Sequence, residues 1–225
     1  LYHVFGLIAV YIWFAFFSRT FVQLNDMAPQ TILNTIRRHR VTHIFAVPLF
    51  WETVYDQALR TIRARGEKTW SRFRRGMRIA EKTAGLPLIG RMFSRLAFRE
   101  IRENLFGESV RFMITGGSEI RRGALTFFNA IGYRLADGYG MTEIGITSVE
   151  LSAKRSILNA RFVGKPMKGM EYKIDENGEL LVKGKAIAKY IIEDGVKKPR
   201  VDGEYFRTKD LVECVDGHYK ILGRR

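Results

Sequence analysis

Three short stretches of this 225-residue chain combine glycines with residues that could bind a nucleotide. The middle stretch, Asp137 to Glu143 (DGYGMTE), holds the densest set. Two glycines flank Tyr139, which leaves its ring free to lie against a planar base. Thr142 offers a hydroxyl to a phosphate oxygen, and Glu143 offers the hard oxygen ligand that Mg²⁺ prefers. A base platform, a phosphate donor and a metal ligand thus lie close together, although a turn with a core tyrosine and a surface glutamate fits the same residues.

The other two stretches are weaker signals on their own. Thr115 to Glu119 (TGGSE) follows an apolar strand and precedes a helix, an order that can bring bare backbone up to a nucleotide. Taken alone, such a motif is more often a plain tight turn. The third stretch is Asp202 to Leu211, followed by Tyr219 to Arg224. Asp210 could accept both hydroxyls of a ribose, and Arg224 could reach ribose or phosphate. A hairpin with surface charges is the alternative for this stretch.

The elements that must position these residues follow from hydrophobic periodicity. Residues 1–150 alternate between helical and short buried-strand patterns, which is typical of a layered α/β domain. After about Leu158, short alternating strands separated by turn signals predict a small β-barrel-like subdomain. We therefore expect an α/β fold, with an α/β part over 1–158 and a β subdomain over 159–225. Predicted strands are His43–Val47, Val110–Thr115, Tyr172–Ile174, Leu180–Val182, Val212–Val215 and Tyr219–Leu222; predicted helices are Thr31–His39, Phe50–Ile62 and two segments separated at Gly85-Leu86-Pro87.

Composition narrows the class of protein. The chain is 46% hydrophobic and 12% aromatic, which is enough apolar material for a packed core. The single cysteine, Cys214, excludes an internal disulfide and suits a reducing cytoplasm. The most apolar window, Val4 to Phe17, is shorter than the roughly 20 residues of a membrane-spanning helix, so we expect a buried helix there. The chain starts at Leu1 without an initiator methionine and stops after a strand-like run, so we expect the natural protein to be longer.

The chain carries a formal charge of +15. The excess is concentrated between Arg60 and Arg122, a segment with about 16 basic and 6 acidic residues. A solvated helix face and a peripheral contact with an anionic membrane both fit this segment. We expect no nucleic-acid partner, because no stacking motif or zinc-finger spacing accompanies the charge. One basic stripe is predicted from Arg91, Arg95, Arg99 and Arg102, with Met92, Phe93, Leu96, Ile101 and Leu105 largely opposite.

In their order and spacing, the three stretches resemble the adenylate-forming superfamily, which includes acyl-CoA synthetases, luciferases and peptide-synthetase adenylation domains. Tyr139–Glu143 looks like the Y-G-x-T-E signature of that superfamily, and Gly203–Leu211 resembles its G-x-aromatic-x-T-G-D-L segment. Tyr219–Arg224 is similar to the Y-x-x-x-G-R segment before the hinge. Leu1–Gly6 resembles the F-H-x-x-G stretch beside the acyl pocket, and Gly164-Lys165-Pro166 resembles the G-x-P turn. The resemblance covers essentially the whole chain.

The resemblance implies a reaction and a set of roles. ATP would activate a carboxylic acid as an acyl-adenylate, and the thiol of coenzyme A would then capture the acyl group. Thr142 would bond a phosphate and Glu143 would hold Mg²⁺, so both are the expected catalytic residues. His3 and Gly164 are the expected acyl-site residues, with a packed core histidine as the alternative for His3. The implied nucleotide-binding residues are Gly117, Ser118, Glu119, Asp137, Gly138, Tyr139, Gly140, Met141, Thr142, Asp210 and Arg224.

The chain also departs from the superfamily pattern. Lys209 stands where glycine is usual, which puts the local backbone in question. The Ser/Thr/Gly-rich phosphate loop and the carboxy-terminal lid with its catalytic lysine are not in this sequence, so the isolated chain is expected not to turn over ATP. The family hinge residue would fall immediately beyond Arg225.

The basic insertion between Ile62 and Val110 and an aromatic-rich entrance look like long-chain fatty acyl-CoA synthetases, with a fatty acid and coenzyme A as substrates. An acyl-carrier-protein ligase, another acid–thiol ligase and a catalytically silent nucleotide- or membrane-binding module are the alternatives. The expected location is the cytoplasm, with peripheral membrane association as the variant. The entrance aromatics are Tyr11, Trp13, Phe14, Phe16 and Phe17.

Overall fold

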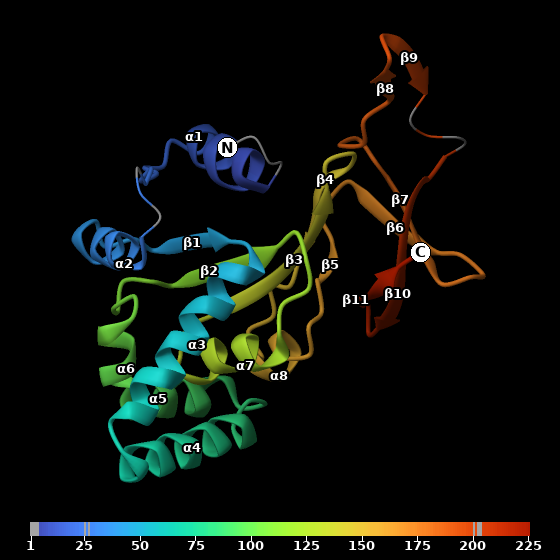
Figure 1. The fold of residues 1–225 in the computed structure, drawn as a ribbon. Coiled ribbons are helices and arrows are strands. Elements are labelled where there is room, and N and C mark those ends of the chain that lie inside the picture. The colour runs from blue at the N-terminus through green and yellow to red at the C-terminus, as the bar shows by residue number, and fades with distance from the viewer. Residues whose placement is uncertain (1–4, 25, 27, 200, 202–203) are drawn as a thin grey trace.

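The computed structural model describes residues 5–24, 26, 28–199, 201 and 204–225 (Figure 1). Its main sheet has the strand order β1-β2-β3-β4-β5. The first three strands are parallel and the last two are antiparallel. The strands are β1 (His43–Ala46), β2 (Phe112–Gly116), β3 (Leu135–Met141), β4 (Gly145–Val149) and β5 (Lys165–Pro166). The two strands predicted from buried apolar runs, β1 and β2, are confirmed.

Helices cover this sheet and give the layered α/β architecture expected from the sequence. Proline occupies the first helical turn of α2, α3 and α5, where its missing N–H has no helical partner to lose. In Figure 1, α3, α7 and α8 lie against one face of the sheet, and α4 and α5 lie farther out. The helices are α2 (Pro29–Arg38), α3 (Pro48–Ala64), α4 (Glu67–Lys82), α5 (Pro87–Ala97), α6 (Arg99–Asn104), α7 (Arg122–Ala130) and α8 (Arg155–Leu158).

A dense aromatic core fixes these helices to the sheet. Trp51 of α3 contacts Phe106 and Phe128 edge to face, and all three side chains are fully buried. Large buried aromatic rings contribute strongly to core stability. Because α3 contacts β2 and α7 contacts β3, this core ties the two helices to the strands that carry the candidate residues.

The apolar segment near the amino terminus forms a helix, but it is not buried. A π-helix (η1, Phe5–Ile12) continues into α1 (Trp13–Phe16), and none of their residues is buried. The expectation of a buried helix over Val4–Phe17 is therefore wrong, with Val4 itself outside the described residues. The segment lies on the open face of the sheet, so only one side of it meets protein (Figure 1). No helix in the described part of the chain has the length and apolar character needed to cross a membrane.

The carboxy-terminal part forms a second sheet, with the order β11-β10-β7-β6, which curls into a half-barrel beside the first sheet (Figure 1). All its pairings are antiparallel, and register shifts in β10 increase its curvature. The hairpins predicted around Asn177-Gly178 and Asp216-Gly217 are confirmed. The strands are β6 (Met170–Ile174), β7 (Glu179–Gly184), β10 (Phe206–Val215) and β11 (His218–Arg224), and β8 (Tyr190–Glu193) pairs separately with β9 (Val196–Pro199).

The first sheet extends past residue 158, because β5 pairs with β4. All strands from Met170 onward belong to the other two sheets. The division into 1–158 and 159–225 stays a prediction.

The single basic stripe predicted over Arg91–Arg102 is wrong. Phe98, with φ −116° and ψ 21°, separates α5 from α6 and interrupts the helical periodicity. Arg102 is only 3% exposed and pairs with Glu108. Met92 and Leu96, expected opposite the stripe, are largely exposed rather than packed.

Candidate active site

A cavity of about 470 Å³ lies at the carboxyl ends of β2 and β3, where it meets the second sheet. Ligands of parallel α/β sheets commonly bind at this end of the strands. Every residue that the sequence predicted for nucleotide binding lines this cavity, although the residues come from three separate stretches. Its lining is Gly117, Ser118, Glu119, Asp137, Gly138, Tyr139, Gly140, Met141, Thr142, Glu143, Arg161, Val163, Asp210, Ile221, Leu222, Gly223 and Arg224.

Tyr139 and Asp210 join the two sheets inside this cavity. The Tyr139 hydroxyl donates a hydrogen bond of 2.6 Å to Asp210 Oδ2, and the two residues are 9% and 8% exposed. Burial, followed by the hydrogen bond to Asp210, raises the pKa of the Tyr139 phenol, so the hydroxyl keeps its proton. Arg224 pairs with Asp210 across β10 and β11, and its Nε lies 3.7 Å from Asp210 Oδ1. The aromatic platform and the proposed ribose acceptor thus face one space.

A second cavity, of about 350 Å³, is mostly apolar and lies between the amino-terminal helical segment and the sheet. Phe5 and Phe14 pack against Phe45 of β1, with ring centroids 6.4 and 5.7 Å apart, and hold the segment over the sheet. Of the predicted entrance aromatics, Trp13 lines the cavity. The two cavities share Gly117, Gly138, Tyr139 and Gly140 as common wall.

Known proteins are similar to this chain in sequence and in fold. Residues 1–191 match the family described as AMP-binding enzyme. The chain belongs to this family. It is 27% identical over 213 residues to the long-chain-fatty-acid–CoA ligase FadD15 of Mycobacterium tuberculosis, covering 87% of this chain and 34% of that ligase. It is 36% identical over 126 residues to the malonate–CoA ligase of Arabidopsis thaliana, covering 51% of this chain and 20% of that ligase.

A solved structure of o-succinylbenzoate CoA synthetase (MenE) from Bacillus subtilis, in complex with ATP and magnesium ion, has the same fold. Its TM-score is 0.66 at 22% identity, over 99% of this chain and 40% of that one. The chain therefore spans about a third of the length of the fatty-acid ligase and less than half of the MenE chain.

In this member of the AMP-binding enzyme family, Thr142 and Glu143 form the turn between β3 and β4. Gly140 has to be glycine, because a Cβ there would collide with the carbonyl oxygen of Gly145 across the hairpin. The backbone N–H of Ala188 donates to the Glu143 carbonyl at 3.0 Å, so the segment between β7 and β8 holds the turn in place. Thr142 and Glu143 both line the cavity of about 470 Å³, which we call the nucleotide cavity after the residues predicted for it.

Glu143 fits a magnesium ion of the kind that nucleotide enzymes use. No group of three or more His, Cys, Asp or Glu that could hold a metal occurs among the described residues. Mg²⁺ in such sites is commonly held by one or two carboxylates together with substrate phosphates and waters. One carboxylate beside a phosphate-sized space is consistent with that mode.

Asp137 is a buried acid at the base of the cavity. Its Oδ1 accepts the backbone N–H of Gly138 at 3.0 Å, and burial raises the pKa of its carboxyl to about 8. The side chain is therefore neutral at pH 7 and can donate a hydrogen bond to an acceptor on a base edge.

The raised pKa of Asp137 predicts a pH-dependent effect of Asp137→Asn. The pKa of this carboxyl is 3.8 in the unfolded chain and about 8 in the native protein. Between pH 3.8 and about pH 8 the native protein therefore holds a proton that the unfolded chain has released, so this group lowers the stability of the protein as the pH rises. Asparagine cannot ionise. We expect the variant and the parent to have equal unfolding free energies near pH 4, and the variant to be more stable by ~1–3 kcal/mol at pH 8. Urea unfolding at both pH values measures this, with Glu176→Gln as an exposed control; an equal loss at both pH values would contradict the assignment.

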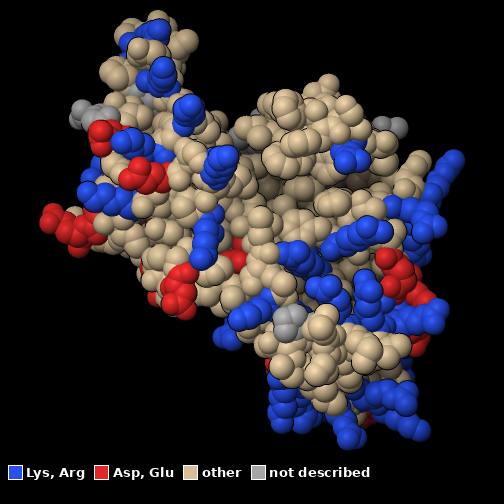
Figure 2. Space-filling model, turned by 180° about the vertical axis from the view of Figure 1, so that it is seen from behind, with Lys and Arg blue, Asp and Glu red and all other residues tan. Residues whose placement is uncertain are grey.

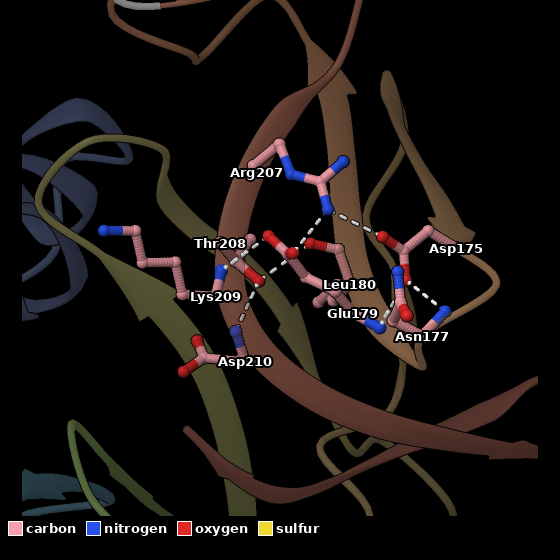
Figure 3. Close-up of polar contacts among 8 residues, drawn as sticks. All are labelled: Asp175, Asn177, Glu179, Leu180, Arg207, Thr208, Lys209 and Asp210. Carbon is pink, nitrogen blue, oxygen red and sulfur yellow. Dashed lines mark hydrogen bonds and ion pairs between the residues drawn. The ribbon is translucent and has the colours of Figure 1, made fainter. Parts of the chain in front are cut away.

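A polar network beneath Asp210 sets the conformation of the strand that carries it (Figure 3). Glu179, which is buried, accepts the backbone N–H of Lys209 at 3.0 Å and the Arg207 guanidinium at 2.6 Å. Thr208 donates to the Leu180 carbonyl at 2.8 Å and accepts the Asp210 N–H at 3.1 Å. Figure 3 shows the Asp210 carboxylate pointing away from this network, and Asp210 lines the cavity of about 470 Å³. Glu179 carries no signal in the sequence, because no motif links it to Asp210, 31 positions later.

Lys209 has a left-handed backbone, with φ +65°. Glycine adopts this conformation without strain, whereas other residues pay ~1–2 kcal/mol. The departure from the family pattern noted in the sequence is therefore a local strain rather than a different backbone path, since the neighbouring Asp210 still reaches the cavity.

We expect Lys209→Gly to stabilise the chain by ~0.5–1 kcal/mol. The substitution relieves the backbone strain of the folded state, and the greater conformational entropy of glycine in the unfolded chain offsets part of that gain. Chemical denaturation measures it. Lys173→Gly, in an exposed position of β6, is the control and should lower stability. A loss of stability in both variants would show that the Lys209 side chain matters more than its backbone.

The structure adds one charged residue that the sequence analysis did not name. Arg161 lines the nucleotide cavity and pairs with Glu119 at its rim. The two are 42 positions apart, so spacing gives no signal. Glu119, one of the implied nucleotide-binding residues, is thus held by an ion pair.

The two residues predicted for the acyl site have different outcomes. His3 lies outside the described residues. Gly164 lines neither cavity; it forms an isolated bridge with Tyr219, and a Cβ there would collide with the carbonyl oxygen of Val149. Its place in the fold is a close backbone approach between the two sheets.

Proposed function

We propose that this chain is part of an ATP-dependent acid–CoA ligase that activates a long-chain fatty acid as an acyl-adenylate. The observation that carries this proposal is the wall shared by the two cavities, at Gly117, Gly138, Tyr139 and Gly140. An apolar tail in one cavity and AMP in the other would place a carboxylate beside the α-phosphate. Family membership supports the reaction class, and the fatty-acid–CoA ligase among the relatives supports the substrate.

The chemistry needs positioning and charge neutralisation more than a nucleophile from the protein. An oxygen of the acid attacks the α-phosphorus of ATP, and the bond to pyrophosphate breaks with both electrons leaving on pyrophosphate. Negative charge grows on phosphate oxygens in that step, where the Thr142 hydroxyl would donate a hydrogen bond. Glu143 would hold Mg²⁺, which neutralises phosphate charge when bound. Tyr139 and Asp210 would fix the base and the ribose.

Coenzyme A as the acceptor is part of the proposal, with an acyl-carrier protein as the enzyme alternative. We also propose that the 225-residue chain by itself does not exchange pyrophosphate into ATP, because a phosphate loop and a lid would have to come from other parts of a longer protein. Exchange by the isolated chain would contradict this. A full-length protein that binds ATP without exchange would instead support a silent nucleotide-binding module.

The substrate is tested by assaying the full-length protein with fatty acids of increasing chain length and with malonate. Long chains should give the highest kcat/KM. Ala9→Phe, which narrows the apolar cavity, should shift the preference to shorter acids without changing the KM for ATP. Ala15→Phe, on the same helical segment but outside the cavity lining, is the matched control. A preference for malonate over every fatty acid would overturn the substrate assignment.

A peripheral contact with an anionic membrane surface belongs to the same proposal. Helix α5 exposes Leu88 (82%) and Leu96 (73%), together with Ile89 and Met92, beside Arg91. Figure 2 shows Lys and Arg side chains (blue) gathered at the lower right around a group of uncharged residues (tan). Helices α4 to α6, at the lower left of Figure 1, lie in this region after the 180° turn between the two views. Apolar side chains ringed by arginines are complementary to anionic lipid.

Cosedimentation with vesicles tests the contact. Leu88→Ser with Leu96→Ser should weaken binding to anionic vesicles, whereas Leu222→Ser, in the second sheet, should not. Equal binding by all three proteins would sink the membrane contact and leave the ligase assignment intact.

A further inference from the structure

A third cavity, of about 420 Å³, lies at the amino ends of β2 and β3, the edge of the sheet opposite the nucleotide cavity. Five arginines from different elements line it. Two come from α5, two directly precede β2 and β3, and one begins α8. They are Arg91, Arg95, Arg111, Arg134 and Arg155.

The positive charge of this cavity is only partly offset within the described chain. Its one acidic lining residue, Glu108, is already paired with Arg102, whose Nε donates to it at 3.0 Å. The protein partners of Arg155 are neutral, with Ser94 Oγ at 2.6 Å. Arg134 donates to the carbonyl oxygens of Leu151 and Ser152. The charge of Glu150 partly offsets that of Arg134, but the Glu150 carboxylate is bonded to His218 and to the Ser152 N–H. None of the five guanidinium groups forms an ion pair with a carboxylate among the described residues.

Two buried donors at this cavity lack acceptors. Among the described residues, Arg134 Nε and Arg102 Nη1 have no hydrogen-bond partner, and Arg102 is only 3% exposed. Arg102 Nη1 lies 2.8 Å from the position that a Cβ would take on Gly132, which lines the cavity. Buried donors without acceptors are rare in native proteins and call for a ligand, a water or an ion.

Mutual repulsion accompanies this arrangement. Burial, and after it the charge of Arg91, lowers the pKa of both Arg134 and Arg155. A protein gains nothing in stability from such a cluster unless an anion offsets the charge.

We propose that this arginine cavity is an anion site for a phosphate group, separate from the nucleotide cavity. Guanidinium groups bind phosphate through paired, charge-assisted hydrogen bonds, and several of them around one space favour a group with more than one negative charge. The phosphate has two sources in chemical terms. One source is the headgroup of an anionic lipid, because α5, which lines the cavity, also exposes Leu88 and Leu96. The other source is a free phosphorylated compound. This inference does not depend on the ligase assignment.

The test uses the full-length protein with AMP saturating the nucleotide cavity. The first probe is inorganic pyrophosphate, followed by calorimetry and by the midpoint of thermal unfolding. The second is a set of phosphatidylcholine vesicles with and without phosphatidic acid. The site variant is Arg91→Ala with Arg95→Ala, both exposed, and the charge-matched control is Lys197→Ala with Lys198→Ala, both exposed on β9 and outside α4 to α6.

We expect the site variant to weaken binding of at least one probe by about tenfold or more, and the control to leave it within about twofold. Binding of pyrophosphate that the site variant loses and the control keeps assigns a free phosphorylated compound, and binding only to phosphatidic-acid vesicles, lost in the same way, assigns a headgroup. Without any anion, the site variant should unfold at the same or a higher temperature than the parent, because repulsion is relieved. A merely structural role of these arginines predicts a lower temperature. Equal weakening in both variants, or no binding of either probe, would overturn the site.

Discussion

Replacing Glu143 by alanine in the full-length protein should reduce Mg²⁺-dependent exchange of pyrophosphate into ATP by about a hundredfold or more, the effect of removing one preorganised charge-stabilising contact. Glu143 is the one carboxylate in the turn between β3 and β4 that lines the nucleotide cavity. Its loss removes the hard oxygen ligand that would hold the metal against the phosphates. Raising the Mg²⁺ concentration should recover part of the rate if the variant still binds ATP.

Two controls separate this effect from damage to the fold. Glu176→Ala removes a carboxylate from an exposed turn, and Cys214→Ala changes an exposed thiol on β10. Both should exchange pyrophosphate at the parent rate. Near-normal exchange by the Glu143 variant would show that another group holds the metal.

Asp210→Asn should raise the KM for ATP by about a hundredfold and change kcat much less, because two charge-assisted hydrogen bonds to ribose would weaken together. The substitution keeps the size of the side chain, and the amide oxygen can still accept the hydrogen bond that Tyr139 donates at 2.6 Å to the parent carboxylate. The effect therefore reports the lost charge rather than a lost contact between the sheets. Initial rates at varied ATP concentration give both constants.

Tyr139→Phe is the companion variant. It keeps the ring against the base and removes the hydroxyl that orients Asp210, so the KM for ATP should rise only by about two- to tenfold. Glu213→Gln, on the same strand as Asp210 but paired with Lys220 outside the cavity, should leave the KM unchanged. A larger effect for Tyr139→Phe than for Asp210→Asn would mean that the tyrosine hydroxyl, and not the carboxylate, contacts the nucleotide.

Local patterns predicted the parts of the fold that local physics decides. The buried runs at β1 and β2, the helix break at Gly85-Leu86-Pro87 and the hairpin at Asn177-Gly178 all depend on residues close in sequence. The candidate site was found because its three stretches each carry several characteristic residues. The structure brings their side chains around one cavity, while the role of each residue stays a prediction.

The errors and omissions come from long-range packing. Apolar periodicity could not tell that the Phe5–Phe16 segment covers a cavity on one side and leaves the other side open. Helical spacing placed Arg102 on a surface stripe, but the break at Phe98 turns it inward to Glu108. Glu179 and Arg161 act on residues 30 or more positions away, and pairings of that kind carry no local signature.

The wall between the two cavities consists largely of bare backbone. A Cβ on Gly138 would meet the Val149 side chain at 3.2 Å and the Ser148 carbonyl oxygen at 3.3 Å, and one on Gly140 would strike the neighbouring strand. No charged side chain among the four shared residues can read the headgroup of an acid at this junction. If an acid reacts here, these four residues give its carboxylate no charged contact, and we expect selection among acids to fall to the far end of the molecule. Swapping residues around the tail should therefore retarget such an enzyme to a new acid while its adenylation chemistry stays intact.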